Sequence, residues 1–208
     1  MGSQPNIGLI LAGEEISFDD ALQRIRCYPK RTLANYDRAA KNGERVRDII
    51  IRTRQLASRI SDREADQLAD CDKSAPWDAV PADMDLANIE VGSSEWNRAD
   101  ALYLHFINSG ISGVAMAKVH KYLHLRRPSL YPILDSRVQS FYRPHKDASL
   151  SLNASSQLSE RQKIWAMIAH DVRTNRSNGT LDLLRDASDE KLEGITDLRV
   201  LDMLVWSN

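Results

Sequence analysis

The chain has 208 residues, a formal net charge of -1 at pH 7 and a hydrophobic content of 42%, which is enough to bury a core. This near-neutral charge argues against a uniformly basic nucleic-acid-binding protein, so that any phosphate-binding surface must be local. Two distant cysteines, Cys27 and Cys71, favour neither a disulfide framework nor a cysteine-rich zinc site, and they fit a reducing compartment.

The N-terminal residues 1–15 contain a short apolar patch within residues 7–11 that runs directly into Glu14 and Glu15. They lack the basic start and the length of a signal peptide, and no later segment approaches the length of a membrane span. We therefore expect a cytoplasmic protein without a membrane partner. The oligomeric state stays open.

Helical patterns begin at Ser17, an expected N-cap that precedes two aspartates suited to the positive end of a helix. Pro29 ends this helix, a second begins near Thr32, and a third is expected over residues 44–60. The third helix turns apolar side chains inward and arginines outward, which predicts a basic surface. The outward arginines are Arg45, Arg47, Arg52, Arg54 and Arg59.

Ser61-Asp62-Arg63-Glu64 has the pattern of a capping box and predicts a short helix that ends before Asp70. Residues 70–94 are loop-like, and acidic residues outnumber basic ones over residues 62–100. This acidic stretch would repel nucleic acid if it faced the same side as the basic residues. Trp77 and Trp96 flank the loop, and we expect them to anchor it to the core rather than to stack on bases.

Gly110 and Gly113 separate two segments of helical periodicity, residues 99–107 and 115–122. The pattern predicts two helices joined by a tight hairpin, with the second helix beginning near Gly113. Free backbone N–H groups at such a helix start suit a phosphate, and Ser112 lies beside them. An ordinary glycine-capped helical hairpin is the alternative, and the spacing alone favours it.

A basic segment follows the hairpin, with Asp135 as the one carboxylate between residues 114 and 146. Aromatic residues interleave with its cations, which is the usual means of holding phosphates and unstacked bases, although a solvated charged face is the alternative. The candidate nucleic-acid contacts are Gly110, Ser112, Gly113, Lys118, Lys121, His124, Arg126, Arg127 and Arg137.

The C-terminal part continues with helical patterns. After a polar linker over residues 143–156, Ser159 to Gln162 has a second capping-box pattern, and two further helices are expected at about 180–187 and 197–206. No strand alternation of any length and no internal repeat is visible. We expect a single helical domain over residues 1–208, or two lobes at about 1–95 and 96–208.

Metal and cofactor motifs are weak or missing. His120 and His124 stand four apart, but Lys121 replaces the glutamate of His-Glu-x-x-His, and flanking cations oppose a metal ion. Walker A, Gly-x-Gly-x-x-Gly and Gly-x-Ser-x-Gly patterns do not occur. The sequence therefore predicts no metal and no other cofactor.

The run Ala-Lys-Val-His-Lys-Tyr-Leu-His-Leu-Arg-Arg-Pro-Ser-Leu-Tyr-Pro-Ile-Leu-Asp-Ser-Arg-Val, residues 117–138, resembles an uncharacterised bacterial family, DUF6308. The resemblance continues in residues 58–61, 75–77 and 198–202. More distantly, the order of glycine hairpin, helix, proline and Asp-x-x-Val is similar to the core of the helix-hairpin-helix DNA glycosylases, including the 8-oxoguanine type.

The glycosylase resemblance implies an all-α, helix-hairpin-helix DNA glycosylase-like domain whose hairpin grips DNA and whose aspartate acts on a flipped nucleotide. Asp135 matches that aspartate, although Asp-Ser-Arg-Val is also a good N-cap. The lysine nucleophile of bifunctional members is absent, since Val114 or Ala115 stands at its place. Lys118, about one turn further along, is the remaining lysine candidate. The iron–sulfur cysteine loop of some members is also absent.

The leading hypothesis is a DNA-binding protein of this architecture that acts as a monofunctional base-excision glycosylase. Asp135 would stabilise positive charge on the sugar or orient water, after the target nucleotide has been extruded. Two alternatives stay open: a non-catalytic nucleic-acid-binding module on the same scaffold, and a protein-interaction module whose basic helix meets an acidic partner. The sequence does not decide whether the protein is an enzyme.

Overall fold

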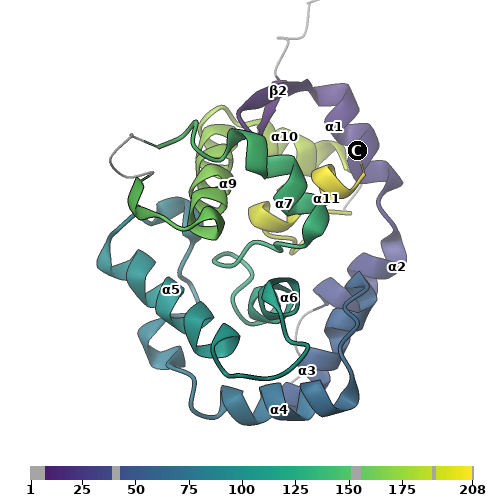
Figure 1. Cartoon of the computed structure of the whole chain (residues 1–208). Coiled ribbons are helices and arrows are strands. Elements are labelled where there is room, and N and C mark those ends of the chain that lie inside the picture. The colour runs from purple at the N-terminus through teal and green to yellow at the C-terminus, as the bar shows by residue number, and fades with distance from the viewer. Residues whose placement is uncertain (1–7, 39–42, 151–155, 189–190, 208) are drawn as a thin grey trace, which may run out of the picture. The chain divides into compact units, whose positions relative to one another are not determined.

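The computed structural model describes residues 8–38, 43–150, 156–188 and 191–207. Its contacts group the chain into two compact units. Pro29–Ser136 forms one, which we call the inserted unit; Met1–Tyr28 and Arg137–Asn208 together form the other, the terminal unit. The contacts thus divide the chain after residues 28 and 136. Residue 95, at which the sequence suggested a division into two lobes, lies inside a helix of the inserted unit. The elements of both units are labelled in Figure 1.

The described part of the chain is mainly helical, as expected. In the inserted unit the elements are α2 (Lys30–Thr32), η1 (Leu33–Asp37), α3 (Val46–Arg52), η2 (Thr53–Leu56), α4 (Asp62–Asp72), η3 (Trp77–Ala79), η4 (Leu86–Asn88), α5 (Ser94–Ile107) and α6 (Met116–Arg126). In the terminal unit they are β1 (Gly8–Leu11), β2 (Glu14–Ser17), α1 (Phe18–Cys27), α7 (Ser136–Tyr142), η5 (Arg143–His145), α9 (Glu160–Ser177), α10 (Thr180–Ala187) and α11 (Asp197–Trp206).

Local capping signals predicted the helix starts well. Ser17 accepts a hydrogen bond from the Asp20 amide at the start of α1, and both capping boxes form, at Ser61 and at Ser159. Two predicted helix ends were wrong. α4 runs on to Asp72, and the helix expected over residues 44–60 closes with η2 because Ala57 takes a left-handed conformation, φ 54°.

The expectation of no strands was wrong at the N-terminus. β1 and β2 pair antiparallel through a two-residue turn in which Ala12 (φ 54°) and Gly13 (φ 77°) are both left-handed. Four-residue strands are too short to show alternation, and alanine is a poor sequence signal for a left-handed turn position.

Helix α9 fixes this strand pair through two buried polar side chains. The Asn175 side chain accepts from the Ile10 amide at 2.8 Å and donates to the Ile10 carbonyl at 2.6 Å. One turn earlier, Asp171 accepts from the amides of Ala12 at 2.6 Å and Gly13 at 3.3 Å. Asn175 therefore continues the sheet's hydrogen bonding at the edge of β1, and Asp171 closes the turn.

Helix α6 forms the centre of the inserted unit and packs against α5 and α3 (Figure 1). Six consecutive residues of α6, from Val119 to His124, are buried. A helix buried on all sides has no solvated face. Among the described residues, no helix combines the length and apolar character that a membrane crossing needs.

Candidate nucleic-acid interface

The two helices predicted on either side of Gly110 and Gly113 are present as α5 and α6, and residues 109–114, which we call the hairpin, lie between them. Gly110 (φ 73°) and Gly113 (φ 83°) both lie in the left-handed region, where glycine has no steric penalty. The second helix begins at Met116 rather than near Gly113, because Ala115 is extended (φ -116°, ψ 177°) and serves as the N-cap. The two glycines therefore shape the loop, and neither caps a helix directly.

The hairpin presents unpaired backbone donors. Gly110, Ser112 and Gly113 are exposed. No described residue accepts a hydrogen bond from the amides of residues 110–113. Ala115 also gives α6 no side-chain cap. The exposed amides and the uncapped start of α6 are thus available to an external acceptor.

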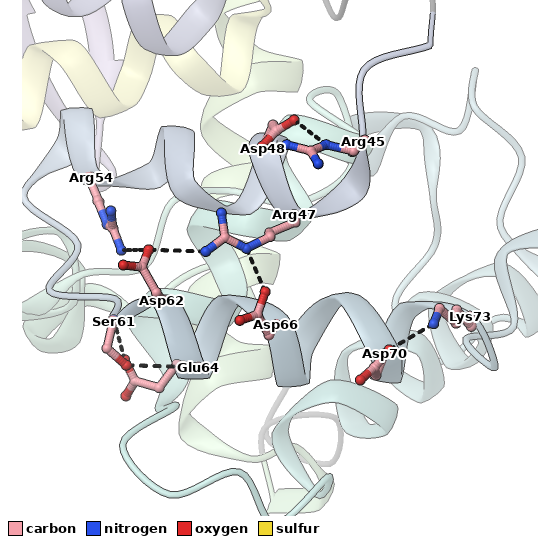
Figure 2. Close-up of polar contacts among 10 residues, drawn as sticks. All are labelled: Arg45, Arg47, Asp48, Arg54, Ser61, Asp62, Glu64, Asp66, Asp70 and Lys73. Carbon is pink, nitrogen blue, oxygen red and sulfur yellow. Dashed lines mark hydrogen bonds and ion pairs between the residues drawn. The ribbon is translucent and has the colours of Figure 1, made fainter.

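Lys118 lies next to this hairpin, and its charge is already engaged. Its Nζ donates to Glu64 Oε1 at 2.7 Å, with the lysine side chain 17% and the glutamate side chain 12% exposed. Glu64 Oε2 accepts from the amide and hydroxyl of Ser61 at 2.7 and 3.0 Å (Figure 2). The Lys118 hydrogen bond, followed by that of the Ser61 amide, lowers the pKa of Glu64. The carboxylate therefore stays ionised beside the hairpin.

The Glu64 side chain lies directly against Gly113. A Cβ at this position would overlap Glu64 Oε1, the outer end of that side chain, and would lie 3.3 Å from Glu64 Cδ. By contrast, a Cβ at Gly110 would meet no atom within 4 Å. The start of α4 thus closes against the second glycine of the hairpin, while the first glycine faces open space.

Lys121 and His124, which the sequence suggested as surface cations, lie inside the inserted unit. The Lys121 ammonium donates to the Leu56 carbonyl at 2.6 Å and lies 3.9 Å from Asp135 Oδ2. His124 Nδ1 lies 2.8 Å from the Tyr131 carbonyl oxygen. The prediction of a basic face was wrong at Lys121 and His124, because α6 is buried on all sides at these positions. Buried polar groups must find partners within the protein.

Arg126 and Arg127 hold the loop of η3. Arg126 donates to Asp72 Oδ1 at 3.0 Å, and its guanidinium lies 4.3 Å from the centre of the Trp77 ring. Trp77 Nε1 donates to the same Asp72 oxygen at 2.9 Å. Arg127 Nε donates to the Val80 carbonyl at 2.9 Å. The predicted anchoring role of Trp77 is confirmed, and both arginines serve the same anchor.

Asp135, the candidate catalytic carboxylate, directly precedes α7 and is 6% exposed. Lys121 supplies a positive charge near it within the inserted unit. Arg137 belongs to the terminal unit, where it donates to the Trp206 carbonyl at 2.8 Å and lies 5.2 Å from the centre of that ring. Of the predicted contacts, the structure therefore gathers Gly110, Ser112, Gly113 and Lys118 at the hairpin, and separately pairs Lys121 with Asp135.

Two of the arginines expected to form a basic surface, Arg47 and Arg54, are neutralised by α4. Arg45 pairs instead with Asp48 at 2.9 Å, and the outward position expected for Arg52 was wrong, since its side chain is buried. Arg47 pairs with Asp62 at 3.2 Å and with Asp66 at 2.5 Å, and Arg54 pairs with Asp62 at 2.9 Å (Figure 2). The acidic stretch does face these arginines, so their surface has mixed charge. The long-range pairing across two helices could not be read from helical periodicity.

Two arginines near the hairpin were missed as site candidates. Arg59 and Arg63 are exposed, and no carboxylate of the described residues pairs with them. They flank Ser61 and precede Glu64, the residue that touches the hairpin. The capping box between them was the signal that could have placed them at an exposed helix start.

Among the described residues, no three or more His, Cys, Asp or Glu side chains come together in a group that could hold a metal ion.

Comparison with known proteins identifies a family. A family model described as a family of unknown function (DUF6308) matches residues 67–208. No curated protein and no solved structure matches the chain. The hairpin, α6 and Asp135 lie within the matched region, whereas Arg59, Arg63 and Glu64 precede it.

Proposed function

The chain belongs to the family of unknown function DUF6308, and we propose that it binds DNA by holding the phosphodiester backbone with the hairpin of residues 109–114. The observation that carries this proposal is the row of amides at residues 110–113, which find no acceptor among the described residues, ahead of a start of α6 that has no side-chain cap. Backbone amides at a helix start, set by left-handed glycines, bind phosphate without reading base sequence. The expected binding is therefore insensitive to sequence.

Cations near the hairpin support the same proposal. Lys118 lies on the first turns of α6. Arg59 and Arg63, with which no described carboxylate pairs, lie beside the start of α4. Two or three phosphate contacts of this kind give a slope of log K against log salt concentration of about -2 to -3. Such binding is weak and steeply dependent on salt. The double substitution of Lys118 and Lys121 is a poor test, because Lys121 is buried and its loss would disturb the fold.

Replacing Gly110 with valine should weaken DNA binding about fivefold or more, since a branched side chain at positive φ distorts the hairpin and covers its amides. Gly92→Val is the matched control. Gly92 has φ 84°, a Cβ there also meets nothing within 4 Å, and it lies outside the hairpin in the same unit. Binding of a fluorescent 20-base-pair duplex is measured by anisotropy across a salt series. Equal weakening by both substitutions would refute a hairpin contact.

A second candidate function, base excision, is favoured by the position of Asp135. A carboxylate buried at the start of α7 with Lys121 3.9 Å away is costly to desolvate, and it lies where the glycosylase resemblance implies the catalytic aspartate. In this proposal Asp135 stabilises positive charge on the sugar while water displaces the base. Lys118 is not proposed as a nucleophile, because its ammonium is bound to Glu64.

Asp135→Asn is expected to abolish any base excision while DNA binding persists. Asparagine retains an oxygen that can cap α7 and nearly the same shape, but it removes the charge. Duplexes carrying damaged or modified bases are screened for abasic-site formation, and each positive is repeated with the variant after melting curves have been compared. Excision at the parent rate by the variant would make Asp135 structural. A protein that binds DNA but cuts no substrate would support the non-catalytic module.

A further inference from the structure

We infer that the Glu64 carboxylate competes with the DNA phosphate for Lys118. In the free protein Glu64 binds the Lys118 ammonium beside the hairpin, and bound DNA takes the place of Glu64 at this ammonium. This inference rests on the proposed function of the hairpin. It adds a regulatory residue, Glu64, which lies outside the residues that match the family model.

The position of Glu64 is the first step of the argument. Its Oε1 accepts from Lys118 at 2.7 Å and would overlap a Cβ on Gly113. A negatively charged oxygen is therefore already present beside the hairpin that offers unpaired amides. A phosphate that approached Lys118 would meet this carboxylate, and two anions cannot share one ammonium without repulsion.

The hydrogen bonds of the carboxylate are the second step. Glu64 Oε2 accepts from the Ser61 amide at 2.7 Å, so the carboxylate bridges the start of α4 and Lys118 of α6. Both side chains of the Glu64–Lys118 pair remain partly exposed, at 12% and 17%. Solvent therefore reaches the pair, and a polyanion can compete with Glu64 for the Lys118 ammonium. When Lys118 turns to a phosphate, Glu64 keeps its Ser61 hydrogen bonds and α4 stays capped.

Glu64→Gln tests the inference with little disturbance of the fold. Glutamine fills the same capping role elsewhere in this chain, where Gln162 Oε1 accepts from the Ser159 amide at 2.9 Å. The substitution removes the charge that holds Lys118 and retains the cap. We expect DNA to bind about threefold to tenfold more tightly at low salt, with little change in the salt slope, since Lys118 contacts a phosphate in both proteins and only the parent must first break the Glu64–Lys118 ion pair.

Asp66→Asn is the matched control. It lies on the same helix, removes the same charge and also frees a cation, because Asp66 pairs with Arg47 at 2.5 Å on the side of α3. The affinity of this variant should change by less than about twofold. An equal gain for both variants would show that only net charge matters and would overturn the inference.

Two further variants complete a double-mutant cycle: Lys118→Gln alone, and Lys118→Gln combined with Glu64→Gln. The gain from Glu64→Gln must disappear when Lys118 is absent. A gain that persists would mean that Glu64 repels DNA directly and does not hold Lys118. Melting curves of all variants exclude unfolding as the cause. If the parent binds DNA and Glu64→Gln equals it, this inference alone fails; if neither the parent nor any variant binds DNA at low salt, the proposed function fails with it.

Discussion

Replacing Asp72 with alanine is expected to lower the free energy of unfolding of the inserted unit by about 3–4 kcal/mol. Asp72 Oδ1 accepts from Trp77 Nε1, Arg126 and the Tyr122 hydroxyl. Alanine leaves all three donors without this acceptor, and the Tyr122 hydroxyl and the Asp72 site are buried. The Arg126 side chain is 22% exposed, so water relieves part of its loss.

Asp70→Ala is the control for this substitution. Asp70 lies on the same helix and pairs with Lys73 at 2.8 Å, but both side chains are about three-quarters exposed, at 74% and 76% (Figure 2). Its loss should change stability by less than about 0.5 kcal/mol. Urea unfolding followed by tryptophan fluorescence measures both variants. If the two variants lost similar amounts of free energy of unfolding, the hydrogen bonds of Asp72 would contribute no more to stability than a surface ion pair.

The stability of the terminal unit should increase as the pH falls from 7 towards 4. Burial raises the pKa of the Asp171 carboxyl from 3.8 to about 6, although hydrogen bonds from the Ala12 and Gly13 amides and the charge of His170 oppose the shift. The folded protein therefore holds a proton between these two values that the unfolded chain releases. The ionised form is penalised in the fold by roughly 2–3 kcal/mol above pH 6, and this penalty disappears as the pH falls towards 3.8.

Comparison with Asp171→Asn isolates this effect, because asparagine does not titrate. The free energy of unfolding of the parent minus that of the variant should rise as the pH is lowered through 6, measured by urea unfolding at each pH. Repeating the comparison with His170→Gln removes the imidazole whose Nδ1 lies 3.8 Å from Asp171. A difference that stays constant with pH, or falls, would contradict burial as the dominant cause.

Features fixed by neighbouring residues could be predicted from the sequence. Ser61 and Glu64 indicate a capping box, because both partners lie within one turn of the sequence. Gly110 and Gly113 indicate a hairpin, because glycine tolerates positive φ. The mainly helical fold followed from such signals. The strand pair did not, since Asn175, which pairs with the edge of β1, lies 165 residues from Ile10.

The candidate site was predictable in its backbone but not in its charges. Lys118, Lys121 and Arg126 look alike in sequence, yet each has a different partner: Glu64, the Leu56 carbonyl and Asp72. These partners come from other helices, at separations that periodicity does not report. The local excess of basic residues therefore reflects cations that bind acceptors within the same unit, and it does not indicate an exposed basic surface.

The division of the terminal unit between the two ends of the sequence sets an order of events during synthesis. At about 5–20 residues per second, Ile10 is made roughly 8–33 s before Asn175, its hydrogen-bonding partner. All of Pro29–Ser136 is translated in that interval and can fold as one piece. Until α9 emerges, Leu9 and Leu11, which end up buried, lack their cover. The edge of β1 therefore lacks its Asn175 partner until most of the chain has been made.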